Sequence, residues 1–217
     1  MQQPMPCSLT GREERANAAS HAAGCLLALG AMPALAQQLD TVQRPLHGLG
    51  VQVFAASLVL TYLVSALYHA SPAGAARQWL RRCDHAAIFL CIAGSYTPFA
   101  LAALQHGRPG GSAALLAAVW AAAGLGMALK LAGRLRHRVA STALYLAYGW
   151  LVAAAAQPVL AALPPSALRL LVAGGLAYSL GSLFFLLDQR LRYGHLVWHL
   201  FVITGSACHV LAVQRML

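Results

Sequence analysis

The chain has 217 residues, of which 59% are apolar and 9% are charged, whereas a soluble domain carries roughly 25% charged residues. This composition excludes an ordinary water-soluble globule. The formal net charge is nevertheless +10, because 15 Lys and Arg residues face only five acids. A nucleic-acid-binding protein would need a contiguous basic face on a soluble scaffold. Here the basic residues form small clusters between long apolar runs, so we expect a multi-pass membrane protein and no nucleic-acid partner.

Seven segments are long and apolar enough to cross a hydrocarbon core, which takes about 20 residues. In chain order they are Ala18–Leu39, Leu46–His69, His85–Leu104, Gly111–Leu131, Val139–Leu160, Leu168–Leu187 and His195–Gln214. They use nearly the whole chain. The sequence therefore predicts an all-α protein with one seven-helix transmembrane domain over residues 18–217, which follows a cytoplasmic N-terminal segment over residues 1–17.

The first span also allows a second interpretation. The run Ala31-Met-Pro-Ala-Leu-Ala36, followed by Gln37, resembles a signal-peptide cleavage site behind a short apolar core. The preceding flank, Arg12-Glu-Glu-Arg15, has no net positive charge, which is unlike the start of a signal peptide. We therefore favour an uncleaved first span, and cleavage would leave six spans with the same orientation.

Lys and Arg residues are divided unevenly between the two sides of the predicted bundle. Alternate connections place eleven of them on the side of the N-terminus and four on the opposite side. Cytoplasmic loops carry an excess of these residues. We therefore expect the N-terminus in the cytoplasm and the C-terminus outside.

Ionisable residues in or beside a span are costly and usually face the interior of the bundle, which makes each one a functional candidate. Five polar residues fall at one depth in the predicted topology, near the cytoplasmic face. They are Ser65 and His69 at the end of the second span, Asp84 just before the third, and His195 and His199 at the start of the seventh.

The spacing of these residues is typical of a metal site. His195 and His199 are four residues apart, so they project side by side about 6 Å apart along a helix. With His69 as a third nitrogen ligand, they match the three protein ligands of a catalytic zinc site. Asp84 would hydrogen-bond a zinc-bound water or a ligand imidazole, and Ser65 would orient that water or the substrate. Two alternatives are interfacial histidines that reach the headgroups, and nickel, copper or iron in place of zinc.

Four further polar residues are weaker candidates. Glu14, Asn17 and His21 share one face at the cytoplasmic start of the first helix, where a hydrogen-bonded helix start explains them equally well. His209 lies on nearly the same face as His195 but about 21 Å deeper, too far to bind the same ion. We expect His209 to be a hydrogen-bonded histidine inside the bundle.

Four ordered motifs resemble those of a known family, the bacterial hemolysin III proteins, which belong with the progestin and adipoQ receptors and more distantly with the alkaline ceramidases. The motifs are Glu14-x-x-Asn17-x-x-Ser20-His21, Ser65-Ala-Leu-Tyr-His69, Arg82-Cys-Asp84-His85 running into Ala93-Gly-Ser-Tyr-Thr-Pro98, and His195-x-x-x-His199 with Gly205-Ser-Ala-Cys-His209. Two departures, Leu196 where relatives often have Glu and Phe89 where Tyr is common, do not touch the candidate site.

The resemblance implies a seven-helix protein of the bacterial cytoplasmic membrane, with a zinc ion near the cytoplasmic face. Its ligands would be His69, His195 and His199, with Asp84 and Ser65 as the associated polar pair. These are the same five residues that the predicted topology brings to one depth.

Two classes of function are compatible with such a site. The first is a zinc-dependent hydrolase of a lipid amide or ester, ceramidase-like by analogy, in which Asp84 acts as general base and Ser65 helps to stabilise the oxyanion. The second is a lipid or membrane-state sensor whose zinc is structural, with Asp84 as a fourth ligand. A cytolytic pore-former ranks below both because the spans are strongly apolar, and a transporter is disfavoured because no internal repeat is visible. Membrane lipids are the expected partners.

Overall fold

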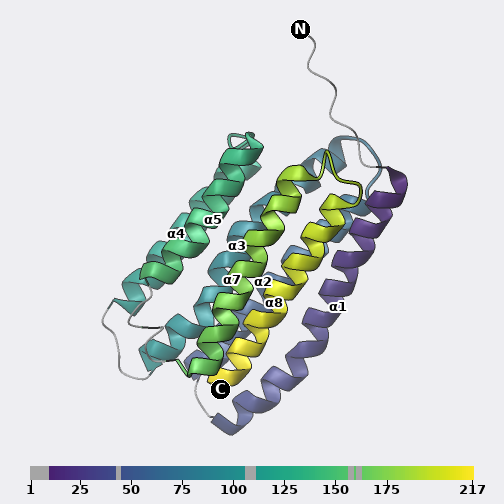
Figure 1. Ribbon diagram of the computed structural model, residues 1–217. Helices are drawn as coiled ribbons and strands as arrows, with labels where there is room; N and C mark the ends of the chain where they lie inside the picture. The colour runs from purple at the N-terminus through teal and green to yellow at the C-terminus, as the bar shows by residue number, and fades with distance from the viewer. Residues whose placement is uncertain (1–9, 43–44, 106–110, 156–158, 160–162) are drawn as a thin grey trace.

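The computed structural model describes residues 10–42, 45–105, 111–155, 159 and 163–217. Within these ranges the protein forms helices and no strand, which confirms the all-α fold class. The helices lie side by side as one elongated bundle (Figure 1). Seven helices are described: α1 (Gly11–Val42), α2 (Pro45–Ala70), α3 (Ala75–Gln105), α4 (Ser112–Leu131), α5 (Arg138–Ala155), α7 (Pro165–Leu187) and α8 (Gly194–Met216).

Six of the described helices, all except α5, are long and apolar enough to cross a membrane. Their outer faces carry large apolar side chains, among them Leu26, which is 70% exposed, and Leu125, which is 63% exposed. Soluble monomers rarely expose wide apolar surfaces. A lipid environment explains this surface, since leucine side chains contact hydrocarbon without cost.

Two helices begin earlier than the spans predicted from hydropathy. α1 begins at Gly11 and α3 at Ala75, so their first turns contain charged residues that a search for apolar runs leaves out. The candidates Glu14 and Asn17 are therefore helical and lie in α1, within the segment assigned above to residues 1–17. α1 also continues as a helix through the Ala31–Ala36 run. Residues 1–9 and the predicted end of the fifth span at Leu160 lie outside the described residues.

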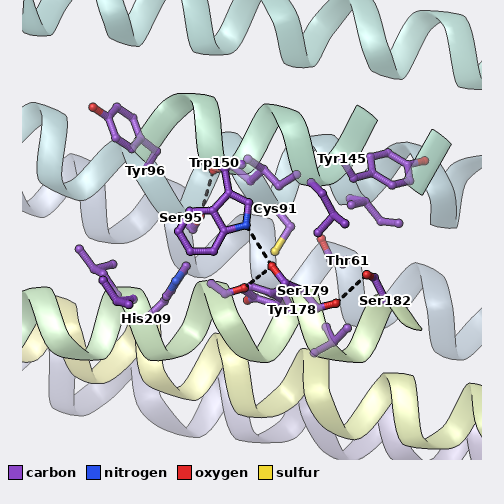
Figure 2. Close-up of a pocket in the computed structure, with 18 of the residues that line it drawn as sticks. Thr61, Cys91, Ser95, Tyr96, Tyr145, Trp150, Tyr178, Ser179, Ser182 and His209 are labelled. Carbon is purple, nitrogen blue, oxygen red and sulfur yellow. Dashed lines mark hydrogen bonds between the residues drawn. The ribbon is translucent and has the colours of Figure 1, made fainter. Parts of the chain in front are cut away.

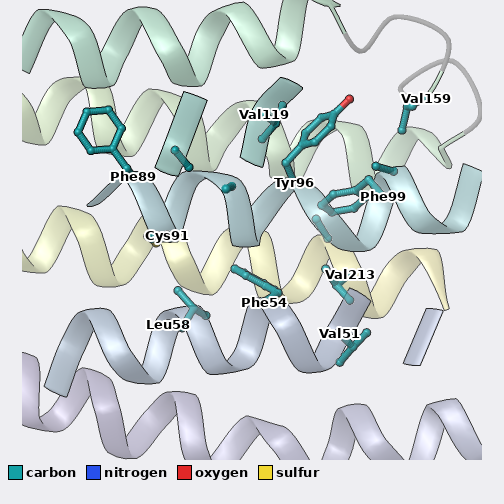
Figure 3. Packing of buried hydrophobic residues seen from close by; sticks show 14 of the residues in the cluster. Val51, Phe54, Leu58, Phe89, Cys91, Tyr96, Phe99, Val119, Val159 and Val213 are labelled. Carbon is teal, nitrogen blue, oxygen red and sulfur yellow. The ribbon is translucent and has the colours of Figure 1, made fainter. Parts of the chain in front are cut away.

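The centre of the bundle is α3. In its most apolar stretch 72% of the residues are buried, against 50% or less in the other spans. Its apolar side chains pack against those of neighbouring helices (Figure 3). Small residues bring α2 close to α3: a Cβ at Gly50 would lie 2.7 Å from the Cα of Pro98, and one at Gly94 would lie 2.1 Å from the Oγ of Ser57. Close packing of small residues around Gly94 and Pro98 therefore holds α2 against α3.

The order of packing brings three helix ends together. α1 packs against both α2 and α8, and α8 packs against α7. The helix starts of α1 and α8 and the last turn of α2 lie at one end of the bundle, and the C-terminus of the chain lies at the other (Figure 1). The candidate residues of α1, α2 and α8 therefore meet at a single end.

Candidate metal centre

Three buried histidines form a compact cluster, which we call the histidine triad. His69 lies in the last turn of α2, and His195 and His199 lie in the first two turns of α8. Each offers a ring nitrogen within 4.8 Å of the others. The ring centroids are 4.9 Å apart for His69 and His195, 5.0 Å for His69 and His199, and 4.7 Å for His195 and His199. The tertiary fold thus joins residues more than 120 positions apart in sequence.

The Nδ1 atom of each triad histidine is engaged by an oxygen outside the triad. Nδ1 of His69 lies 2.7 Å from Oε2 of Glu14, and Nδ1 of His195 lies 2.8 Å from Oδ2 of Asp188. Nδ1 of His199 lies 2.9 Å from Oγ of Ser20 and 3.2 Å from the carbonyl oxygen of Asn17. Carboxylates and carbonyls only accept hydrogen bonds, so each Nδ1 carries the proton and donates it.

This arrangement leaves each Nε2 as the nitrogen with a free lone pair. Nε2 of His69 is buried and has no hydrogen-bond partner among the described residues, and the same holds for Oγ of Ser65, one turn earlier on α2. Metal-binding histidines commonly donate their other N–H to a carboxylate or carbonyl. Three imidazoles with fixed tautomers therefore fit a zinc ion, and no fourth protein ligand joins them among the described residues.

A tight turn between α7 and α8 places Asp188 beside His195. Tyr193, the residue before α8, has a left-handed φ of 57°. A Cβ at Gly194 would lie 2.9 Å from the Cα of Asp188, so only glycine allows the chain to fold back this closely. The turn also donates the backbone N–H of Tyr193 to Oε1 of Glu13 at 2.9 Å, which fixes the start of α1 against the start of α8.

The two carboxylates that bind triad histidines are also paired with arginine. Arg138 lies 2.7 Å from Oδ2 of Asp188, and Arg77 pairs with Oε1 of Glu14. Burial raises the pKa of Asp188, but the hydrogen bonds from His195 and Arg138 outweigh burial, so its pKa lies below the ordinary value. Asp188 therefore remains an ionised hydrogen-bond acceptor for His195. Sequence reasoning missed Asp188 and Arg138. The one available signal was that the chain has only five acidic residues, so each of them is a candidate for a functional role.

The weaker candidates of α1 lie against the triad. The His21 ring stacks on the His199 ring with centroids 3.5 Å apart and planes 9° apart. His21 and Asn17 are 4% and 1% exposed, and their side-chain nitrogen and oxygen atoms have no hydrogen-bond partner among the described residues. The polar face of α1 therefore contributes directly to the surroundings of the triad, which goes beyond a hydrogen-bonded helix start.

Two other candidates are not part of the triad's ligand group. Asp84, on α3, is half-buried, and the described residues give it no hydrogen bond or ion pair. His209 lies deep in α8, where its ring packs edge-on against Tyr178 with centroids 5.5 Å apart. His209 is thus separate from the metal centre, and the role of Asp84 stays a prediction.

A polar cavity of about 900 Å³ opens at the triad. Its walls include Glu14, His69, His85, Asp188, His195 and several basic side chains. Tyr68 and Tyr145 also line it. A ligand in this polar cavity would therefore lie against His69 and His195.

The fold and the site define a helical membrane protein with a buried histidine triad at one end of its bundle. The family model described as "Haemolysin-III related" matches residues 10–210, and the chain belongs to this family. It is 37% identical over 201 residues to Hemolysin-3 of Bacillus cereus, an alignment that covers 90% of this chain and 88% of the relative. It is 36% identical over 198 residues to the Hemolysin-3 homolog of Bacillus subtilis (strain 168), covering 91% of each.

A more distant similarity extends to animal proteins. The chain is 28% identical over 171 residues to the monocyte to macrophage differentiation factor of Homo sapiens, covering 76% of this chain and 69% of that protein. No solved structure matches the chain. The expected resemblance to the hemolysin III proteins is confirmed.

Proposed function

We propose that the protein is a zinc-dependent hydrolase of a lipid amide or ester. The observation that supports this most directly is the triad itself: three Nδ1 atoms are engaged by oxygens outside it, which leaves three Nε2 atoms within reach of one another. His69, His195 and His199 would hold the zinc. Three protein nitrogens with a fourth position left open are the pattern of catalytic rather than structural zinc.

Zinc bound at such a site supplies Lewis acidity and favours ionisation of water near neutral pH. Glu14 and Asp188 keep the protons of His69 and His195 on Nδ1, which orients both rings. The unpartnered hydroxyl of Ser65 would donate a hydrogen bond to the carbonyl oxygen of the scissile amide or ester. Asp84, whose carboxylate is not ion-paired among the described residues, would accept a proton from water and pass it to the leaving group.

We further propose seven membrane passes in the bacterial cytoplasmic membrane, with the N-terminus in the cytoplasm and the C-terminus outside. Two observations support this topology. α1 begins at one end of the bundle and α8 ends at the other, as an odd number of passes requires (Figure 1). Basic side chains gather around the polar cavity at the triad end, and cytoplasmic loops carry the excess of Lys and Arg.

The test combines metal analysis with a lipid assay. Protein purified in detergent and its His199→Ala variant are analysed for bound metal and then incubated with a membrane lipid extract, whose products are identified by mass spectrometry. We expect one zinc per wild-type chain, loss of zinc in the variant, and release of fatty acid by the wild type alone. Unchanged zinc in His199→Ala would contradict the ligand set.

The same experiment separates the hydrolase from its alternatives. Stoichiometric zinc with no change in any lipid class would favour a sensor in which the zinc is structural. The names of the Bacillus relatives raise cytolysis, which predicts leakage of a dye from vesicles that contain the protein. Leakage that persists in His199→Ala would show that the triad is not needed for it.

A further inference from the structure

The polar cavity carries more positive charge than its own acids can neutralise. Six basic side chains line it, and its two acidic side chains, Glu14 and Asp188, already pair with Arg77 and Arg138 and with triad histidines. The other four have no carboxylate partner in the part of the chain that the structure describes: Arg81, Arg82, Lys130 and Arg136. Asp84 is not among the residues that line this cavity. An anionic ligand group would therefore be stabilised here.

Lys130 is the best-defined of the four cations. It lies at the end of α4 and is only 6% exposed, although it carries a charge in a membrane-spanning helix. Its Nζ donates hydrogen bonds to the carbonyl oxygen of Leu135 and to Oγ of Ser141, both at 2.8 Å. An ammonium group has three donors. These two bonds fix the position of Nζ and leave one N–H for a ligand in the cavity.

A second cavity, which we call the apolar cavity, lies between α3, α5, α7 and α8 and has a volume of about 230 Å³ (Figure 2). Aliphatic and aromatic side chains make up most of its wall. Several of its polar side chains are already hydrogen-bonded to each other or to neighbours: Nε1 of Trp150 donates to Oγ of Ser179 at 3.0 Å, and the hydroxyl of Tyr178 lies 2.9 Å from Oγ of Ser206. The surface that remains suits a hydrocarbon chain.

The two cavities border each other, because Tyr145 and Phe185 line both of them. Nζ of Lys130 lies 5.7 Å from the centroid of the Tyr145 ring, and the Phe185 ring lies 5.8 Å from the ring of His195. This border therefore has a fixed cation on one side and a triad histidine on the other. An amphiphile that passed between Tyr145 and Phe185 would extend from the cationic polar cavity into the apolar cavity.

We propose that the ligand of this protein is a lipid with an anionic phosphate headgroup, which binds among Lys130, Arg81 and Arg136 while its chain occupies the apolar cavity. Phosphate oxygens accept strong hydrogen bonds from ammonium and guanidinium groups, and a zwitterionic headgroup would bring a positive charge into the same cavity. This inference names the substrate class of the proposed hydrolase and rests on that function for its chemistry, but binding can be measured without turnover.

The test measures lipid retention by mass spectrometry of the intact zinc-loaded protein. The protein is exchanged into micelles with equal amounts of lysophosphatidylglycerol and lysophosphatidylethanolamine, and glycerol phosphate or inorganic phosphate is added in separate samples. We expect wild type to retain the anionic lipid about tenfold over the zwitterionic one, as charge-assisted hydrogen bonds predict. Lys130→Met and Arg136→Gln should each bring the ratio toward about one.

Arg134→Gln is the matched control. Arg134 lies in the same loop as Arg136 and is also exposed, but it does not line the polar cavity. We expect Arg134→Gln to keep the wild-type preference. Because Arg136 is exposed, its variant should fold even if the change at buried Lys130 disturbs the structure.

Three results would overturn the inference: equal retention of both lipids by wild type, an unchanged preference in Arg136→Gln, or displacement of the lipid by inorganic phosphate alone, which would indicate a soluble anion. Anionic preference without any lipid turnover would leave the inference standing and remove the proposed hydrolase. Turnover of zwitterionic lipids alone would support the proposed hydrolase and overturn the inference of an anionic ligand.

Discussion

At the scale of single residues, the decisive feature is that each triad histidine is oriented by an oxygen from outside its own helix. Glu14 of α1 holds His69, Asp188 after α7 holds His195, and the start of α1 holds His199. Each of these contacts fixes the tautomer in which Nε2 is free. The chemistry of the site therefore depends on residues that would not themselves touch the metal.

This arrangement predicts that Glu14→Gln and Asp188→Asn each weaken zinc binding by about 10- to 100-fold, since loss of such a partner commonly costs that much. An amide accepts a weaker hydrogen bond and no longer raises the basicity of the imidazole. The measurement is zinc affinity by competition with a chelator. Glu13→Gln is the control, because Glu13 bonds Thr10 and Tyr193 and no histidine. Equal zinc affinity in Glu14→Gln and Glu13→Gln would refute the prediction.

The sequence identified part of this residue-level picture. His69, His195 and His199 follow from helical spacing and predicted depth, and the structure brings them together. Glu14 was only a weaker candidate, and Asp188 was not a candidate. Nothing local shows that the turn before Gly194 folds Asp188 back onto His195, because that depends on the left-handed Tyr193 and on contacts with α1.

At the scale of elements, the close contact between α2 and α3 determines how the triad end is assembled. Gly50 lies against the backbone of Pro98 and Gly94 against Ser57. α2, which carries His69 in its last turn, also packs against α1, and α1 packs against α8. The hydropathy pattern located α2 and α3. It left out the charged first turns of α1 and α3, because an apolar run marks the part of a helix that crosses the membrane and not the whole helix.

We expect Gly50→Ala to destabilise the protein by about 1–3 kcal/mol, the usual cost of an added methyl group in a tightly packed contact. Its Cβ would lie 2.7 Å from the backbone Cα of Pro98, which cannot rotate away. Gly48→Ala on the same helix is the control, because no atom lies within 4 Å of its Cβ. Thermal unfolding in detergent measures the difference. A Gly50→Ala variant as stable as Gly48→Ala would show that the helices separate easily.

At the scale of the whole molecule, basic residues and the triad share one end of the bundle. Arg77, Arg81 and Arg82 come from the start of α3, and Arg136 and Arg138 from the connection between α4 and α5 and the start of α5. In the proposed topology, the same charges that surround the polar cavity would also orient the bundle in the membrane. The proposed orientation and the proposed anion binding would then be two consequences of one charge distribution.

The topology is open to a direct test with reporter fusions. Alkaline phosphatase, which is active only outside the cytoplasm, should be active when fused after Leu217 and inactive when fused after Arg136. A fluorescent protein that matures only in the cytoplasm should give the opposite pattern. The expected cause is the excess of Lys and Arg on the side of Arg136. Activity of both phosphatase fusions would rule out the three passes proposed between Arg136 and Leu217.

The sequence by itself determined the helical class, the membrane environment and the three histidines, because hydropathy and helical spacing are local properties of the chain. Only the tertiary structure decided which acids orient those histidines and that a cationic cavity and an apolar cavity share Tyr145 and Phe185 in their walls. The physical reason is that the sequence predicts which residues share a helix face but not how each helix is rotated about its axis. The packing of small residues and the tight turns between helices decide which neighbouring residues that face contacts.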